Sequence, residues 1–202
     1  MLKTLSRLIS IILHPIVMPC LGIFLMIESG NYMPLLSWNA KKYILLIVFI
    51  TSFALPLSLI PFIYYRSITR IKTSVNDYQK LYPLLVTIIF YFFGYFILSR
   101  IGTPAITGKF MLSCLILAFT LLIISTKWNI SLHMAGICSL AGSLLTVAGS
   151  EFYDLRLVFM AVILASGLLG FSRLHLNMNR QWEVYTGFAA GFSVFFIILS
   201  IF

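Results

Sequence analysis

The stretch that decides the fold runs from Tyr43 to Tyr65 and reads YILLIVFITSFALPLSLIPFIYY. It contains no Asp, Glu, Lys or Arg, and it is longer than the run of about 20 apolar residues that a helix needs to cross a bilayer. The stretch is apolar on every helical face, whereas a strand of a membrane β-barrel alternates polar and apolar residues over about 10 positions. It therefore predicts a membrane-spanning α-helix and excludes a barrel.

The chain as a whole is also rich in hydrophobic residues and poor in charged residues. Of its 202 residues, 61% are hydrophobic and 9% are charged, and the mean hydropathy is +1.05, whereas a soluble domain carries roughly 25% charged residues. The pattern predicts an all-α, polytopic helical bundle with a single domain over residues 1–202. We expect seven spans, with six as the alternative, because the two shortest runs need flanking basic residues that reach the headgroups. The expected spans are 8–27, 43–65, 81–99, 110–126, 128–150, 157–172 and 184–202.

We interpret the three cysteines and the N-terminal apolar run as parts of membrane spans. Cys20, Cys114 and Cys138 all fall within expected spans, which favours packing over a disulfide framework or a metal site. No small-residue cleavage site follows the first apolar run, so we interpret that run as the first span rather than as a signal peptide. No cofactor is indicated.

Two expected spans carry paired prolines. Pro15 and Pro19 lie in the first span, and Pro56 and Pro61 lie in the second. Each proline removes a backbone donor and bends a helix. We therefore expect kinks in both spans, with a structural role favoured over a gating role.

The basic residues are unevenly divided between the two ends of the expected spans. Nine lie at the end that includes the N-terminus and five at the other. Because Lys and Arg accumulate on the cytoplasmic side, this division favours a cytoplasmic N-terminus. The net charge of +9 is spread over both ends without a continuous basic stripe, so nucleic-acid binding is not expected.

Polar residues concentrate in three connections, at 66–83, 127–133 and 172–183. In a seven-helix chain these are alternate connections, so all three emerge on one side of the membrane and can converge. They contain basic side chains, hydroxyls and imidazoles, and guanidinium and ammonium donors match phosphate oxygens in charge and geometry. We therefore expect a site for an anionic headgroup at this membrane face.

The last of these connections resembles a motif of the type 2 phosphatidic acid phosphatase (PAP2) superfamily, in which Ser-Arg is followed by five residues, His, three residues and Asp. Here Ser172 and Arg173 are followed by five residues, then Asn179 in place of His, three residues, and Glu183 in place of Asp. The spacing agrees and two identities differ. The chain looks like a compact bacterial member of that superfamily, which implies a multi-pass protein of the cell (inner) membrane.

Two weaker matches accompany this motif. Ser131 and His133 form a Ser-Leu-His where the family has Pro-Ser-Gly-His. Lys72 and Lys80 resemble a degenerate version of the family's Lys and Arg-Pro motif, with Lys80 in place of the Arg and a spacing that is not the standard one. The resemblance covers about residues 66–195, and it implies a bundle of PAP2 type.

The resemblance also implies a phosphoryl-transfer chemistry. In the family, the third-motif His attacks phosphorus, the acidic residue orients it, and the second-motif His protonates the leaving oxygen. The amide nitrogen of Asn179 has no available lone pair, so we expect binding of a lipid phosphate or diphosphate with impaired hydrolysis. The expected partners are a phosphorylated lipid and the membrane lipids. The implied catalytic positions are His133, Asn179 and Glu183, and the implied phosphate-binding positions are Lys72, Lys80, Ser131, Ser172 and Arg173.

Three alternatives stay open. His175 lies one helical turn before Asn179 and could be a displaced nucleophile in an active phosphatase, although a shift of about 5 Å disturbs in-line geometry. Asn179 could also be a substitution in an otherwise active protein. The third alternative is a small transporter or a non-enzymatic scaffold. In that case His133 is merely an interfacial residue, and the charges of Arg173 and Glu183 only interact favourably with the dipoles of the helix ends at which they lie.

Overall fold

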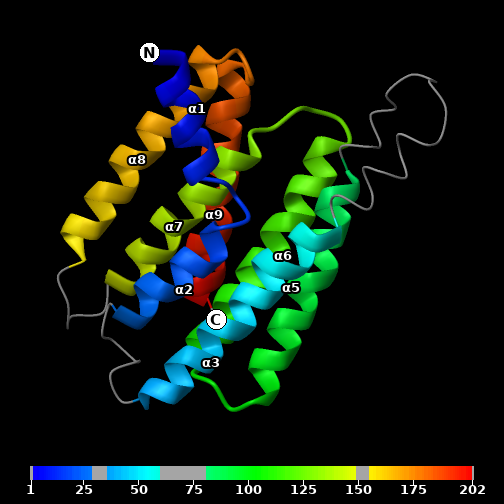
Figure 1. Ribbon diagram of the computed structural model, residues 1–202, viewed down its shortest axis with the longest axis vertical. Coiled ribbons are helices and arrows are strands. Elements are labelled where there is room, and N and C mark those ends of the chain that lie inside the picture. The colour runs from blue at the N-terminus through cyan, green and yellow to red at the C-terminus, as the bar shows by residue number, and fades with distance from the viewer. Residues whose placement is uncertain (1, 29–35, 60–80, 149–154, 202) are drawn as a thin grey trace.

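The computed structural model describes residues 2–28, 36–59, 81–148 and 155–201, and every regular element in these ranges is helical (Figure 1). The expected all-α fold is therefore confirmed for the described ranges. The elements are α1 (Leu2–Ile12), α2 (Met18–Glu28), α3 (Trp38–Phe49), the π-helix η1 (Ile50–Ala54), α5 (Tyr82–Arg100), α6 (Ala105–Ser125), α7 (Leu132–Ala148), α8 (Arg156–His175) and α9 (Gln181–Ile201).

Five of the described helices are long and apolar enough to cross a membrane, as expected of a multi-pass membrane protein. They are Trp38–Leu59, in which α3 and η1 belong to one continuous helix, together with α5, α6, α8 and α9. Two further apolar helices, α2 and α7, are shorter. The number of seven spans therefore stays a prediction. The helix expected at 128–150 begins only at Leu132.

The first expected span, 8–27, was wrong as a single helix, because residues 13–17 separate α1 from α2. Pro15 has no N–H, and its ring disfavours a helical backbone at the preceding residue, His14. The chain instead closes a tight turn, in which the Val17 N–H donates to the His14 carbonyl oxygen over 3.0 Å. The proline predicted to bend this segment thus divides it into two helices.

A π-helical turn widens the second expected span. The turn η1 occupies Ile50–Ala54 and ends two residues before Pro56. Pro56 cannot donate to the carbonyl four residues earlier, and a wider turn gives its ring room. Thr51 and Ser52 in this turn are buried, and their hydroxyls donate to carbonyl oxygens one turn earlier, over 2.8 Å and 2.7 Å. Pro61 lies outside the described residues.

Helices α7 and α9 form the centre of the bundle, with α8 and α1 on one side and α6, α5 and α3 on the other (Figure 1). Glycines allow their backbones to approach. A Cβ atom on Gly187 would lie 2.6 Å from the Ser131 carbonyl oxygen, and one on Gly191 would overlap the Ala135 carbonyl group. This is the close approach that small residues permit between membrane helices.

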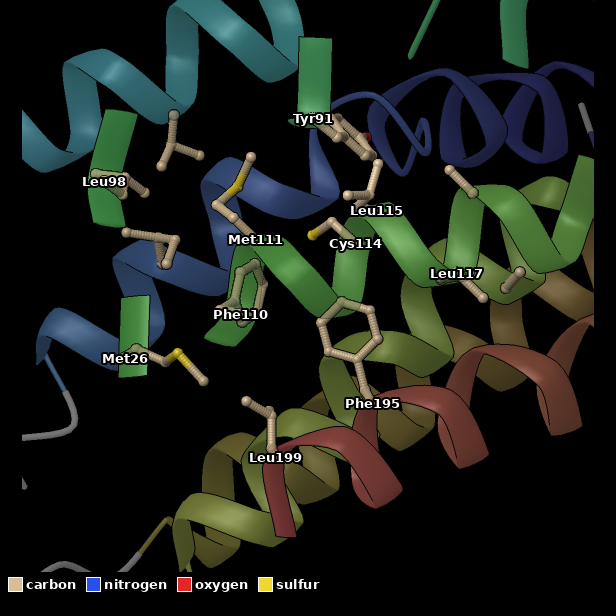
Figure 2. Close-up of a cluster of buried hydrophobic side chains, with 14 of the residues drawn as sticks. Met26, Tyr91, Leu98, Phe110, Met111, Cys114, Leu115, Leu117, Phe195 and Leu199 are labelled. Carbon is tan, nitrogen blue, oxygen red and sulfur yellow. The ribbon is translucent and has the colours of Figure 1, made fainter. Parts of the chain in front are cut away.

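A large group of buried side chains lies where α6 meets α2, α5 and α9 (Figure 2). Phe110 of α6 and Phe195 of α9 pack edge to face, with ring centroids 5.2 Å apart. Cys114 is buried in this cluster and Cys138 in a second one around α7, as expected of packing thiols. The outer surface is also apolar, and Leu164, for example, is 70% exposed. Such a surface is typical of a protein covered by lipid tails.

Candidate functional site

The polar connections 127–133 and 172–183 lie at the end of the bundle that carries the N-terminus (Figure 1). They are joined directly, because the Ser131 N–H donates to the Glu183 carbonyl oxygen over 3.1 Å. Two of the three connections expected to converge therefore do so, and the third lies largely outside the described residues. The predicted phosphate ligands in that third connection, also outside the described residues, are Lys72 and Lys80.

The end of α8 is a turn that directs the chain back toward the helix. Asn177 has a φ of +51°, its N–H donates to the Leu174 carbonyl, and the Met178 N–H donates to the Arg173 carbonyl, over 3.0 Å and 3.1 Å. This pairing is a Schellman motif, which ends a helix at a residue in the left-handed region, here Asn in place of the commoner Gly. The turn places Asn179 beside Arg173.

Asn179 links Arg173 to Glu183. Its Oδ1 accepts a hydrogen bond from Arg173 Nε over 2.8 Å, and its Nδ2 donates to Glu183 Oε2 over 2.7 Å. Glu183 is only 6% exposed, where an unpaired carboxylate would be strongly destabilising. The amide donor offsets this burial, as does the position of Glu183 in the first turn of α9, where the helix dipole favours negative charge. Asn179 therefore acts as a bridge between the two charges.

Helix α1 holds the opposite side of the Arg173 guanidinium. Arg173 Nη1 donates to Ser10 Oγ over 3.2 Å and to Met178 Sδ over 3.1 Å. Ser6 and Ser10 are the buried residues of α1, and its exposed residues include the apolar Leu5 and Leu8 as well as the basic Lys3 and Arg7. The sequence interpretation missed this contact because it placed Ser10 within one long span. The available signal was the spacing of the two serines, which puts both hydroxyls on one helix face.

Two imidazoles lie near Arg173. The rings of His14 and His133 pack edge to face, with centroids 5.2 Å apart and an interplanar angle of 81°. His133 is at the start of α7, whereas His14 lies in the connection between α1 and α2, outside the helices long enough to span the membrane. Burial, and then the positive charge of Arg173, lower the pKa of His14. His14 was missed for the same reason as Ser10; its signal was a His-Pro pair inside an apolar run.

Arg173, His14 and His133 line a pocket of about 410 Å³, a volume within the range of small-molecule sites. Most of the remaining wall is apolar, and much of it comes from α5 and α6. Asn179 and Glu183 are not part of this wall; Asn179 contacts Arg173, and Glu183 contacts Asn179. The apolar wall includes Leu84, Phe110, Leu117, Leu121 and Phe195.

Three further residues considered from the sequence are not in the pocket wall. The Ser172 hydroxyl donates to the Leu168 carbonyl over 2.8 Å, and Ser131 Oγ is buried without a hydrogen-bond partner among the described residues. His175 stacks on Phe171, with ring centroids 5.7 Å apart and an interplanar angle of 6°. Their roles in phosphate binding or nucleophilic attack stay predictions without support from the pocket geometry.

Comparison with known proteins assigns no family to the chain: no protein-family model matches it, and no curated protein or solved structure shows significant similarity. A guanidinium and two imidazoles in one pocket can bind an anion through charge and hydrogen bonds. The amide of Asn179 supplies no nucleophile.

Proposed function

We propose that the chain binds a phosphorylated or diphosphorylated lipid in the pocket lined by Arg173, His14 and His133. One observation carries the proposal: the guanidinium and the two imidazoles lie in a pocket whose other walls are mainly apolar. A lipid with an anionic headgroup matches both the polar side chains and the apolar walls of this pocket. The guanidinium charge attracts phosphate oxygens, and its Nη2 is engaged by no contact among the described residues. Burial of a hydrocarbon chain against the apolar wall is also favourable.

The arrangement of charges supports an anionic ligand. Arg173 lines the pocket, whereas the compensating charge on Glu183 is buried behind the Asn179 amide. An anion in the pocket would therefore meet the cation first. Surroundings of low dielectric constant strengthen that attraction relative to water. The same surroundings disfavour a cationic ligand, which would face the guanidinium.

We also propose a seven-span bundle of PAP2 type in the cell (inner) membrane, with impaired hydrolysis. The support is the motif spacing and the bridging position of Asn179, whose two polar atoms are both engaged by Arg173 and Glu183. An amide nitrogen whose lone pair is delocalised forms no bond to phosphorus, so the covalent phosphoenzyme of that family is not expected. His133 lines the pocket together with Arg173.

Lipid binding to the purified protein in detergent tests the proposal, with phosphatidic acid and farnesyl diphosphate as probes. Arg173→Gln is expected to weaken binding of one or both at least tenfold, about 1.4 kcal/mol, because it removes the positive charge and the guanidinium donor. Arg180→Gln is the matched control, since Arg180 is exposed in the same connection, and it should bind within twofold of the wild type. Equal binding by the wild type and Arg173→Gln would overturn the proposal.

A second variant covers the case in which Arg173→Gln does not fold. Arg173→Lys keeps a positive charge opposite Glu183 but presents a point charge in place of the planar fork. We expect a stable protein, with a wild-type size-exclusion profile, that binds both lipids more weakly than the wild type. Wild-type affinity in this variant and in Arg173→Gln would assign the ligand to another part of the chain.

A small transporter is the second candidate, and the break between α1 and α2 beside the pocket favours it. Transporters build central sites from interrupted helices. In proteoliposomes, movement of a labelled lipid phosphate between leaflets that Arg173→Gln abolishes would support transport, whereas binding without movement would support the first proposal. The direct contact of Ser131 with Glu183 argues against a scaffold with separate, solvated loops.

A further inference from the structure

His14 is held in one orientation by the chain around it. Its carbonyl oxygen accepts a hydrogen bond from the Val17 N–H over 3.0 Å, and its ring Nδ1 accepts one from the Ile16 N–H over 3.3 Å. The intervening Pro15 has no N–H to compete for either acceptor. The His14 ring is therefore part of the structure that closes the break between α1 and α2, and rotating it would leave the Ile16 N–H without this partner.

The contact with Ile16 also determines where the proton of the ring lies. A nitrogen that accepts a hydrogen bond presents a lone pair, so Nδ1 carries no proton. A neutral imidazole carries one proton, which must then be on Nε2. An imidazolium would carry protons on both nitrogens and would lose the contact. The lowered pKa of His14 agrees with a neutral ring.

We infer that His14 donates a hydrogen bond from Nε2 to an oxygen of the anionic group that Arg173 binds. His14 lines the pocket together with Arg173. Because its Nδ1 faces the backbone of Ile16, the Nε2 edge is the one left for a ligand. The identity of the anion, a phosphoryl group, is taken from the proposed function, and the inference rests on it in this respect. Both a lipid headgroup and free phosphate carry such a group.

A neutral donor contributes something that a second cation would not. It orients one oxygen of the ligand without adding a charge that would repel Arg173. The tautomer also prevents His14 from acting as a nucleophile, because the Nδ1 lone pair is occupied and Nε2 carries the proton. His14 is thus a binding residue, distinct from the position that Asn179 occupies in the motif.

Amide substitutions that imitate one ring nitrogen or the other test the inference. Gln places an amide nitrogen near the position of Nε2, whereas Asn places one near Nδ1. With 1-oleoyl lysophosphatidic acid as the probe, we expect His14→Gln to bind within threefold of the wild type and His14→Asn at least tenfold more weakly. His175→Asn is the matched control, because His175 stacks on Phe171 outside the pocket wall, and it should bind like the wild type.

Inorganic phosphate, tested as a competitor of the lipid, distinguishes the two sources of the phosphoryl group. Competition that is weaker in His14→Asn than in the wild type would show that His14 contacts free phosphate as well. A loss of affinity confined to the lipid would assign the contact to a lipid headgroup. Equal lipid binding by the wild type and His14→Asn would overturn the inference and leave the proposed function intact.

Nitrogen-15 NMR of the histidine-labelled wild type, without ligand, provides an independent measurement. We expect His14, assigned by the signal missing from His14→Gln, to carry its proton on Nε2. A proton on Nδ1 would overturn the inference whether or not the protein binds lipid. If the wild type bound no lipid phosphate, the proposed function and the ligand contact would both fall, whatever the tautomer.

Discussion

Asn179 donates a hydrogen bond of 2.7 Å to the buried carboxylate of Glu183. An imidazole at position 179 would donate its Nδ1–H to the same carboxylate and leave Nε2 unprotonated. Asn179→His is therefore expected to introduce a nucleophile and to release phosphate from lysophosphatidic acid in detergent, with no release above background from the wild type. Asn179→Gln is the inactive control. Binding of the lipid without phosphate release in Asn179→His would contradict the proposed PAP2 lineage.

The bridge between Arg173 and Glu183 should contribute measurably to stability. Asn179→Leu removes the acceptor for one charge and the donor to the other, so we expect a loss of about 3 kcal/mol in the free energy of unfolding. Denaturant titration in detergent measures this loss. Asn129→Leu, at an exposed position of the connection before α7, should change stability by less than about 0.5 kcal/mol. A similar small effect at both positions would show that the bridge is not stabilising.

The turn at the end of α8 makes a separate prediction. Asn177 has a φ of +51°, which a residue with an ordinary side chain adopts at a penalty of about 1 kcal/mol. Asn177→Ala is expected to destabilise the protein by about this amount and to weaken lipid binding, because the turn positions Asn179. Asn177→Gly, which tolerates this φ, should match the wild type in thermal stability and in binding. Equal behaviour of the two variants would exclude a conformational role for this residue.

Two glycines in long helices should respond oppositely to the same substitution. In Gly191→Ala the new Cβ would overlap the carbonyl group of Ala135, whereas at Gly167 no atom lies within 4 Å of that position. We expect Gly191→Ala to destabilise the protein by about 1–3 kcal/mol through overpacking. Gly167→Ala should be neutral or stabilising by up to about 1 kcal/mol through helix propensity. Thermal denaturation in detergent compares them, and a stable Gly191→Ala would contradict the close packing of α7 and α9.

Stability should also depend on pH through His14. The pKa of His14 is lowered in the folded chain from the ordinary value of 6.5, so the unfolded chain binds more protons as the pH falls below that value. The contribution of the neutral ring is thus fully present above pH 6.5 and is lost as the pH falls toward the folded pKa. The melting temperature should decrease between about pH 7.5 and about pH 5.5, and by less in His14→Gln. Parallel curves for the two proteins would contradict this assignment.

The helices could largely be predicted from the spacing of charges, because burial of charge in hydrocarbon is so unfavourable that uncharged runs mark the spans. Ser172, Arg173, Asn179 and Glu183 were selected by motif spacing, and three of them form the hydrogen-bonded bridge in the structure. The αL turn at Asn177 that makes this possible has only a weak sequence signal, because Asn is also common in ordinary loops.

The contribution of the N-terminal segment could not be predicted in the same way. Ser10 contacts Arg173 across 163 positions of the chain, and hydropathy carries no information about which helices become neighbours. A proline in a membrane helix can produce either a kink or an interruption, so the apolar run did not predict the break at His14. The packing of α1 on α8 is what selects the interruption.

The glycine contacts that join α7 to α9 have a mechanical consequence for ligand access. Two helices in backbone contact have little freedom to slide past each other, so His133 and the first turn of α9 behave as one rigid block. The apolar wall of the pocket belongs largely to α5 and α6, which are packed on each other. A hydrocarbon tail is therefore expected to enter by displacing that helix pair outward, while His133 and the first turn of α9 keep their relative positions.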